Sequence, residues 1–267
     1  MTSPERSTEV WKTQHEIAHD SLSEFMFLYH DWIYPNTMET LRGKDVLDAG
    51  SGPGVQIRMM SEVARSITAV DLEALDVSAR KTEDVAGKVN YVRDDILKMD
   101  LGRQFDVVNC VGVIHHTDNP TTTFKNLVRH LKPGGRMIIW AYAEEGNYLM
   151  KHFVEPMRKA VLDKAPHSVI WSLSVAITAM LWPIVNTVYR LPLTFLPYYE
   201  YFANFRRLSF RRNVLNVYDK LNAPQQHFIS RATMESWFNP GEFEDVHLSQ
   251  YAGVSWRGSG TKRATAR

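Results

Sequence analysis

DVLDAGSGPG, at residues 45–54, is a short strand pattern that runs directly into a glycine-rich turn. Glycines at positions 50, 52 and 54 let the backbone bend sharply and approach a ligand where a side chain would collide. A helical pattern, Val55–Arg65, follows the turn, and a second strand pattern, Ser66–Val70, follows the helix. In an open parallel sheet, ligands bind beside such a turn, at the carboxyl ends of the strands. The stretch therefore predicts an α/β fold with a ligand site at this turn.

Strand and helix patterns keep alternating as far as Trp140. Helical patterns are expected at Leu72–Ala86 and Pro120–Leu131. Strand patterns are expected at Val89–Val92, Phe105–Val111 and Met137–Trp140. The strand at Phe105 is nearly all apolar, as strands buried on both faces are. This alternation predicts a doubly wound, Rossmann-like parallel sheet with crossover helices.

Changes in composition divide the chain into five segments. We expect an N-terminal helical segment (1–40), the Rossmann-like core (41–143), a mainly helical, aromatic-rich insertion (144–228), a final helix with two strands that complete the core (229–258), and a flexible tail (259–267). In the first segment, apolar residues from Ile17 to Tyr29 have helical spacing, and Pro35 follows. In the fourth, we expect a helix at Arg231–Phe238 and strands at Phe243–Gln250 and Val254–Gly258.

Overall composition excludes several classes of protein. With 267 residues, 44% apolar and 23% charged, the chain is neither disordered nor a disulfide-stapled miniprotein. Its 31 basic and 30 acidic residues give a net charge of +1, so we expect no nucleic-acid partner. Cys110 is the single cysteine, and Met1–Glu9 lacks the apolar run of a signal peptide. We therefore expect a cytoplasmic protein.

Asp48, at the tip of the first strand, indicates what the turn binds. A carboxylate there opposes a pyrophosphate on the helix N-terminus, and Val55 stands where a dinucleotide fingerprint needs its third glycine. These two features disfavour an NAD-dependent oxidoreductase. A carboxylate instead suits a ligand with an ammonium and a sulfonium, such as S-adenosyl-L-methionine.

Acidic residues also follow the second and third strands. Asp71 comes 17 residues after Gly54, where a carboxylate can accept hydrogen bonds from ribose hydroxyls. After the third strand, Asp94, Asp95 and Ile96 could meet an adenine amino group and ring nitrogen. We prefer Asp95 over Asp94 for that contact.

Five blocks, VLDAGSGPG, AVDLE, YVRDDIL, FDVVNCVGVIHHTDNP and LKPGGRMIIW, occur in order between residues 46 and 140. In this order and spacing the chain resembles the class I S-adenosylmethionine-dependent methyltransferase family. The resemblance covers Leu41–Trp140, and Arg231–Gly258 is similar to the family's closing helix and strand pair. It implies a seven-stranded sheet in the order 3-2-1-4-5-7-6, with strand 7 antiparallel.

The resemblance also implies the residues around the cofactor. Those expected near its methionine part are Asp48, Gly50, Ser51, Gly52 and Gly54. Asp71 and Leu72 would meet the ribose, Asp94, Asp95 and Ile96 the adenine, and Val111 the region near the sulfonium. Pro53 departs from the usual turn because it lacks an N–H. The implied product is S-adenosyl-L-homocysteine.

Two adjacent histidines are the candidates for a general base. His115 and His116 follow the fourth strand, and adjacent side chains point in different directions, so at most one is expected to face the acceptor. Histidine suits proton removal near neutral pH. A packing role for both remains the alternative, and we slightly favour His115 as the base. The chain has no metal-binding motif.

Acceptor choice is expected to depend on the insertion. Its residues Ser168–Tyr189 are uncharged, but polar side chains and Pro183 interrupt them, and a membrane span would separate the last strands from the sheet. Three roles remain open: a cap over an apolar acceptor pocket, a homo-oligomer interface, and a surface resting on a membrane. Arginines among the following aromatic residues (198–212) could bind an anionic group on the acceptor or lipid head groups.

The sequence thus predicts a methyltransferase for a small-molecule or lipid- or glycan-like acceptor. O-methylation is slightly favoured, because a candidate base implies a proton to remove. The alternative from another class is a regulatory protein that binds the cofactor without transferring methyl.

Overall fold

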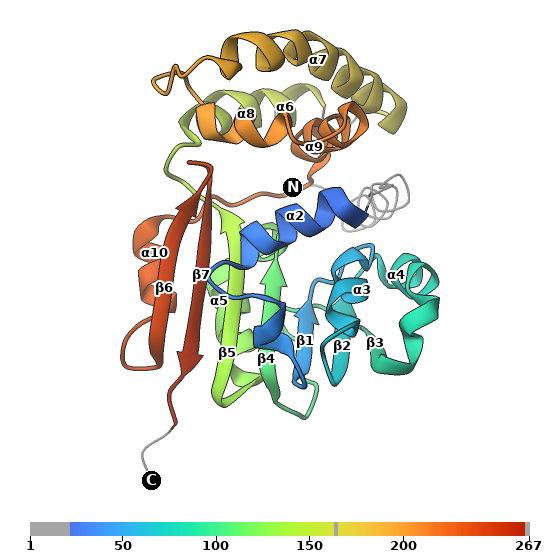
Figure 1. The fold of residues 1–267 in the computed structure, drawn as a ribbon, viewed down its shortest axis with the longest axis vertical. Coiled ribbons are helices and arrows are strands. Elements are labelled where there is room, and N and C mark those ends of the chain that lie inside the picture. Colours follow the sequence, from blue (N-terminus) through green and yellow to red (C-terminus); the bar gives the residue numbers. More distant parts are fainter. Residues whose placement is uncertain (1–21, 163–164, 265–267) are drawn as a thin grey trace.

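The computed structural model describes residues 22–162 and 165–264, and its centre is one seven-stranded sheet (Figure 1). The strands are β1 (Asp45–Ala49), β2 (Ser66–Asp71), β3 (Val89–Arg93), β4 (Phe105–Val111), β5 (Leu131–Tyr142), β6 (Phe243–Tyr251) and β7 (Ser255–Lys262). Their order is β3-β2-β1-β4-β5-β7-β6. β7 runs antiparallel to both of its neighbours, and the other pairs are parallel. The predicted fold class and strand order are confirmed.

Two apolar layers cover the sheet. On one face, α5 (Pro120–Arg129) and α10 (Arg231–Trp237) bury Phe124, Leu127 and Trp237 against the strands. On the other, α2 (Leu22–Ile33) and α3 (Val55–Ser61) bury Tyr29, Ile33 and Ile57. β4 lies between these layers with its apolar side chains buried, which explains its continuous apolar pattern.

Element ends differ from the sequence-based expectation at several points. The helix expected at Val55–Arg65 ends at Ser61, and Leu72–Ala86 divides into α4 (Leu75–Lys81) and a 3-10 turn, η2 (Glu83–Lys88). β5 begins at Leu131, six residues before the predicted start at Met137. Another short 3-10 turn, η1 (Met38–Leu41), precedes β1. The first part of the expected N-terminal helix, through residue 21, lies outside the described residues, and its second part is α2.

The prediction of a flexible tail from Ser259 is wrong for the first residues of that segment. β7 continues to Lys262, because its backbone pairs with β5 on one side and β6 on the other. The small residues that suggested a loose tail have a packing role instead. A Cβ at Gly260 would lie 3.0 Å from Phe238 and 3.1 Å from Phe243, so glycine lets the strand pass closely beneath these rings.

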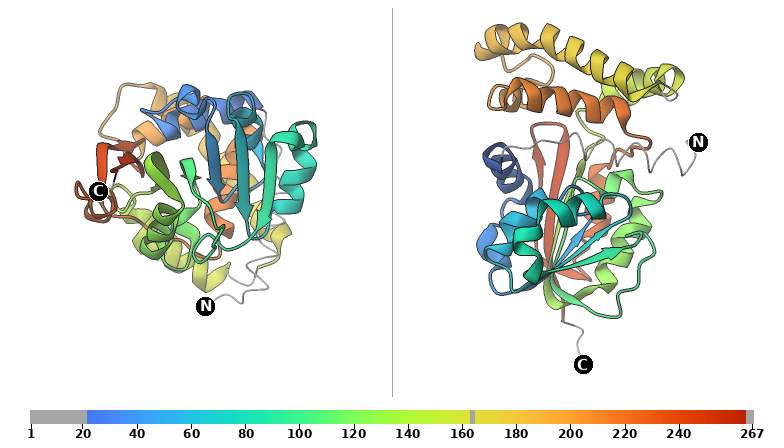
Figure 2. Two further views of the ribbon diagram at one scale, coloured as in Figure 1. Left: turned by 90° about the horizontal axis from the view of Figure 1, so that it is seen from below. Right: turned by 90° about the vertical axis from the view of Figure 1, so that its right-hand side faces the viewer.

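The insertion forms a helical cap across the carboxyl ends of the parallel strands (Figures 1 and 2). It contains a π-helical turn, η4 (Met150–Val154), then α6 (Glu155–Val161), α7 (His167–Thr187), η5 (Val188–Arg190), α8 (Tyr199–Phe205) and α9 (Phe210–Asn222). The cap has its own apolar cluster, which includes Ile170, Val185 and Tyr218. One helix of the described chain, His167–Arg190, is long and apolar enough to cross a membrane by length and composition.

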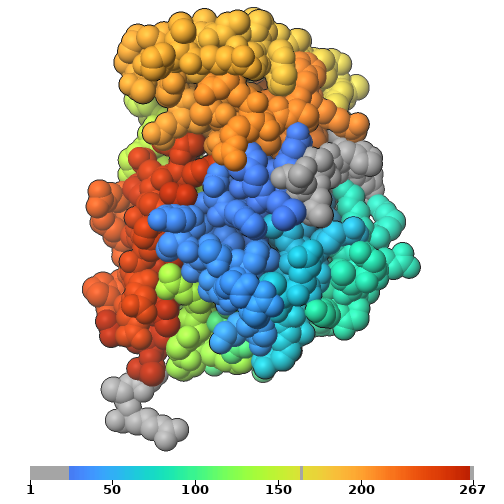
Figure 3. Space-filling view, in the orientation of Figure 1, coloured from blue at the N-terminus to red at the C-terminus, as the bar shows by residue number. Residues whose placement is uncertain are grey.

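Hydrogen bonds attach the chain leaving the cap to the turn after β4. The His227 N–H donates to the His115 carbonyl over 2.8 Å, and the Gln225 side chain donates to the Thr117 carbonyl over 3.0 Å. That turn is η3 (Ile114–His116). In Figure 3, α2 (blue) lies directly beneath the cap (orange), and its Tyr29 and Ile33 pack on one face of the sheet. The cap is therefore held over the sheet from two sides.

Candidate functional site

A cavity of about 1470 Å³ lies between the carboxyl ends of the strands and the cap. One end is lined by the glycine turn and by the loops after β2 and β3. The other end is lined by α2, α8, α9 and the end of β5. Of the residues predicted for the site, those that line the cavity are Gly50, Gly52, Asp71, Leu72, Asp94, Asp95, Ile96, Val111 and His116. Asp48, Ser51, Gly54 and His115 lie behind this surface, because all four are buried and outside the lining.

The glycines of the turn have different roles. Gly50 and Gly52 have positive φ angles, 84° and 51°, which bring their backbone to the cavity surface. Gly54 precedes α3 with φ 83°, and a Cβ there would lie 2.6 Å from the Ser78 hydroxyl. Gly54 thus allows α3 and α4 to pack closely and does not touch the cavity.

Asp48 is a buried carboxylate with one oxygen bonded. Its Oδ1 accepts a 2.8 Å hydrogen bond from the Asn109 side chain, while Oδ2 has no hydrogen-bond partner among the described residues. Asn109 is in register with Asp48 on β4 and accepts from the Tyr29 hydroxyl. Burial raises the pKa of Asp48 to about 7, and the nearby Asp71 adds to this rise. A cation next to Oδ2 would remove this cost, which fits a ligand that carries an ammonium.

Three half-buried carboxylates at the carboxyl ends of β2 and β3 line the cavity next to the glycine turn. Asp71 Oδ2 accepts from the Gly52 N–H over 2.9 Å, and its Oδ1 accepts from Glu73 and Ala74, so the β2 tip fixes the glycine turn. Asp95 Oδ1 accepts from the Leu97 N–H over 2.9 Å, and Asp94 Oδ1 accepts from the Asp95 N–H over 2.7 Å. A carboxylate oxygen has two lone pairs, so each can also accept from a ligand hydroxyl or amino group.

The donor set fits S-adenosylmethionine. A buried carboxylate oxygen without a partner lies near the turn, and the acidic residues after β2 and β3 line the adjoining wall. Asp71 would meet the cofactor's ribose and Asp95 its adenine, and Asp48, behind the glycine turn, would supply the negative charge that attracts the ammonium. Among the described residues, no group of three or more histidine, cysteine or acidic side chains could hold a metal ion.

Comparisons with known proteins agree with this geometry. Residues 47–139 match the family model described as a methyltransferase domain. This stretch contains the glycine turn and every acidic residue of the cofactor wall. Residues 47–139 are a class I S-adenosylmethionine-dependent methyltransferase domain.

Similar sequences are named for O-methylation. The chain is 34% identical over 99 residues to a ubiquinone biosynthesis O-methyltransferase of Nitrosospira multiformis, which covers 36% of this chain and 41% of the relative. It is 28% identical over 147 residues to the enzyme of the same name from Coxiella burnetii, covering 47% and 62%. The chain thus spans less than two thirds of the length of these curated relatives.

A solved structure supports the fold over most of the chain. The apo crystal structure of the S-adenosylmethionine-dependent methyltransferase SibL has a TM-score of 0.51 at 16% identity, covering 91% of this chain and 55% of that one. The identity is too low to carry residue roles, so the comparison concerns the fold alone.

In the methyltransferase domain, the two histidines have unlike surroundings. His115 is completely buried, and neither ring nitrogen has a hydrogen-bond partner among the described residues. His116 lines the cavity, and its Nδ1 lies 2.7 Å from the Gln225 carbonyl, so Nδ1 carries the proton and Nε2 the lone pair. Burial lowers the pKa of His116, which keeps the ring neutral near pH 7. This geometry reverses our preference for His115 as the base.

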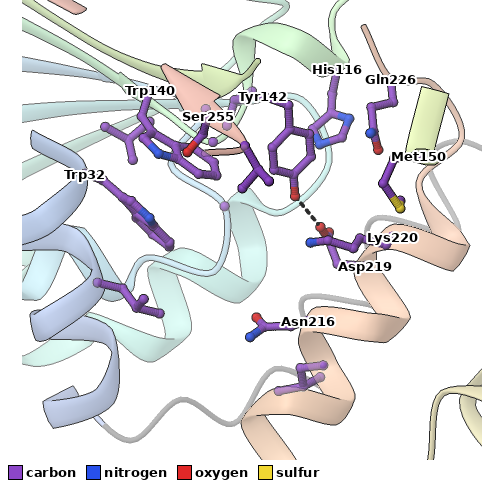
Figure 4. Close-up of a pocket in the computed structure, with 18 of the residues that line it drawn as sticks. Trp32, His116, Trp140, Tyr142, Met150, Asn216, Asp219, Lys220, Gln226 and Ser255 are labelled. Atoms are coloured by element: carbon purple, nitrogen blue, oxygen red, sulfur yellow. Dashed lines mark hydrogen bonds between the residues drawn. The ribbon is translucent and has the colours of Figure 1, made fainter. Parts of the chain in front are cut away.

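Residues from the cap complete the cavity beside His116 (Figure 4). The Tyr142 hydroxyl, at the end of β5, donates to Asp219 Oδ2 of α9 over 3.1 Å. The Lys220 ammonium lies 5.3 Å from the Tyr142 ring centre and 5.2 Å from that of Tyr201. Burial opposes the Lys220 charge, but Tyr142, Tyr201 and Asp219 outweigh it and hold the pKa of Lys220 above its usual value. The ammonium therefore stays charged inside the cavity.

The sequence patterns do not predict that Tyr142, Asp219 and Lys220 line the cavity. Tyr142 could have been found, since it ends the fifth strand at the edge of the sheet where the site lies. Asp219 and Lys220 lie on an ordinary amphipathic helix, α9, and nothing in its pattern separates them from solvated charges. Their position follows from the docking of the cap alone.

Proposed function

We propose that the protein transfers a methyl group from S-adenosyl-L-methionine to an oxygen atom of a small acceptor that has a large apolar body. The continuous cavity is the observation that carries this proposal. Its volume of about 1470 Å³ exceeds the roughly 300–1000 Å³ of a pocket for one small ligand. There is room for cofactor and acceptor together.

The character of the lining changes along the cavity. Asp71, Asp94 and Asp95 line the cofactor end. Apolar and aromatic side chains dominate toward the cap, namely Phe25, Leu28, Trp32, Ile177, Leu181, Phe202, Phe205 and Leu208. This part suits a lipid-like or aromatic body, and the charged Lys220 suits a hydroxyl or anionic group at its head.

Methyl transfer from a sulfonium is an in-line displacement, and the bound cofactor would supply the activated methyl group. The residues of this chain have to orient the acceptor, remove its proton and exclude water. His116 Nε2 has the lone pair to take the proton from an acceptor hydroxyl as the new carbon–oxygen bond forms. Tyr142 and Lys220 lie on the same wall, where they can orient the acceptor oxygen. The cap and α2 cover part of the cavity and limit the access of bulk water to it.

Oxygen as the methylated atom is supported by two observations. The neutral His116 provides a base, which a hydroxyl acceptor needs. The similar sequences from Nitrosospira multiformis and Coxiella burnetii are named O-methyltransferases. The second candidate, a protein that holds the cofactor without transfer, is favoured by no feature of the cavity beyond the cofactor end.

The test is turnover with a graded series of acceptors. Purified protein is incubated with methyl-labelled cofactor and phenols that carry alkyl chains of increasing length, and the products are examined by NMR and mass spectrometry. We expect methyl on oxygen, with kcat/KM rising as the chain lengthens and fills the apolar end. Methyl on nitrogen or carbon would contradict the proposed reaction. Calorimetric binding of S-adenosylhomocysteine with no turnover of any phenol would favour the regulatory alternative.

A further inference from the structure

The outer face of α7 is an apolar surface that no other described element covers. Large side chains project at helical spacing from α7 and from the first residue of η5, which continues it: Val169, Leu173, Met180, Ile184 and Val188. We call these five residues the α7 outer face. Met180 is 64% exposed, and beyond the helix Phe195 is 79% exposed in a proline-bounded loop. Exposed apolar patches of this kind mark interaction surfaces.

The opposite face of α7 is already used inside the cap. Ile170 and Val185 are buried in the cap cluster with α8 and α9. The Ser174 hydroxyl donates to the Ile170 carbonyl and the Thr178 hydroxyl to the Ser174 carbonyl, both over 2.7 Å, so these polar groups are satisfied within the helix. α7 is thus a fixed part of the fold with one side left open, and spanning a membrane would require it to leave α9.

Formal charge is sparse along this surface. From Ala165 to Tyr199, the sequence contains one formally charged residue, Arg190. Arg190 is exposed at the end of the helix. The Arg206 guanidinium donates to the carbonyl of Tyr189, next to it. A long uncharged apolar surface that ends in arginines complements a lipid leaflet with anionic head groups.

Shape distinguishes a membrane from a protein partner. Figure 1 and the right-hand view of Figure 2 place α7 as the outermost element of the cap, a single ridge on the far side from the sheet. Two convex ridges of this kind would touch along a line, whereas a stable protein interface buries about 800 Å² on each side with a polar rim. A fluid bilayer adapts to a convex ridge and needs no hydrogen-bonding rim.

We propose that the α7 outer face, with Phe195, rests on the surface of a membrane that contains anionic lipids. The helix lies in the plane of the head groups, its outer side chains enter the acyl boundary, and Arg190 meets lipid phosphates. The inner side of α7 stays packed on α9.

The test is flotation of the full-length protein with vesicles of phosphatidylcholine alone and of phosphatidylcholine with phosphatidylglycerol. The double variant Met180→Glu/Ile184→Glu should bind at least about tenfold more weakly. The control is Val246→Glu on β6, because Val246 is 39% exposed and Ile184 is 42% exposed. This control should bind like the wild type. Arg190→Ala should weaken binding about fivefold, and only to vesicles that contain phosphatidylglycerol.

A second measurement does not depend on charged variants folding. Cys110 is buried, so a polarity-sensitive thiol dye on Phe195→Cys labels one site. Its emission should shift to the blue when vesicles are added. The proposal would be overturned by wild-type protein that floats with neither vesicle, by equal binding of the double variant, or by a dimer that the double variant dissociates without change in flotation. Resistance to alkaline carbonate extraction would also overturn it, in favour of a span.

Discussion

Aspartates at the two ends of the central sheet differ in their hydrogen bonding. At the amino ends of the strands, Asp45 accepts from Arg65 over 2.9 Å and from Ser66 over 2.7 Å. Its neighbour Asp106 accepts from Lys132 over 2.7 Å. Three residues along the same strand, at the carboxyl end, Asp48 has one oxygen without a partner among the described residues. The carboxylates at the amino end have their hydrogen-bond partners within the protein. At the carboxyl end, an oxygen of Asp48 remains available to a ligand's charge.

The pKa values of these acids shift in opposite directions. Hydrogen bonds from Arg65 and Ser66 hold the pKa of Asp45 well below its usual range, whereas burial raises that of Asp48 to about 7. An acid with a lowered pKa contributes stability above about pH 4, which is lost as the pH falls. An acid with a raised pKa costs stability as the pH rises from about 4 to 7. Ionised Asp45 thus stabilises the fold, and ionised Asp48 opposes it until a cation binds.

His130 and His116, which lie toward opposite ends of the sheet, also differ in their hydrogen bonding. His130, near the start of β5, has Nδ1 2.9 Å from the Asn126 carbonyl and accepts from the Leu101 N–H at Nε2 over 3.2 Å. His116 uses Nδ1 in the same way but lines the cavity. Bonding both nitrogens to backbone makes a histidine structural, and fixing one tautomer beside a cavity makes it a candidate base.

The largest expected effect comes from the histidines. His116→Gln should lower kcat by about 10²- to 10⁴-fold, because a general base contributes about that much, while the affinity for S-adenosylhomocysteine changes little. The measurement is turnover of a phenol acceptor together with calorimetry. His130→Gln is the matched control and should lower the melting temperature without a comparable fall in kcat of the folded protein. Unchanged turnover in His116→Gln would mean that the proton leaves by another route.

The two aspartates of β1 give the next effect. Asp48→Asn should weaken S-adenosylhomocysteine binding roughly 10- to 100-fold, because the negative charge that attracts the ammonium is lost. It should also raise the free energy of unfolding at pH 8, by on the order of 1–3 kcal/mol, because a buried charge is removed. Asp45→Asn should instead lower the free energy of unfolding by about 1–2 kcal/mol and leave the binding of S-adenosylhomocysteine unchanged. Calorimetry and urea unfolding measure both. If the two variants behaved alike, the contrast between the ends of the sheet would be mistaken.

The smallest effect is on pH dependence. Below pH 7, Asp48 of the ligand-free protein is protonated, and binding of the cofactor's ammonium would release that proton. The affinity for S-adenosylhomocysteine should therefore fall with decreasing pH below about 7, by at most tenfold per unit. Calorimetry between about pH 5.5 and 8, a range that spans the pKa of about 7 of Asp48, measures this slope. Asp48→Asn should flatten it; a slope that persists in this variant would belong to another group.

Much of the fold could be predicted because local patterns carried it. The parallel part of the sheet was predicted from the alternation of strand and helix patterns and from the apolar β4. The glycine turn indicated the edge of the sheet at which the cavity lies. The length of β7 could not be predicted, since Ser259, Gly260 and Thr261 are typical of loose termini. Only the place of Gly260 beside Phe238 and Phe243 shows why a residue without a side chain is needed there.

Some residues of the cavity could be predicted from local patterns in the sequence, and others could not. Asp71, Asp94 and Asp95 line the cavity as expected, because strand ends in a parallel sheet meet at one edge. Sequence spacing could not decide between His115 and His116, since it does not say which ring lines the cavity and lies against the Gln225 carbonyl, 109 positions further along the chain.

By itself, the sequence determined the alternation of strands and helices and the glycine turn, because both are short-range patterns along the chain. The strand order came from the family resemblance, and the structure confirms it. Tertiary structure decided the rest. It buried His115, placed Asp219 and Lys220 against Tyr142, and left one side of α7 uncovered. These outcomes depend on how the cap packs over the sheet, and contacts between residues so distant in the chain leave no local pattern to read.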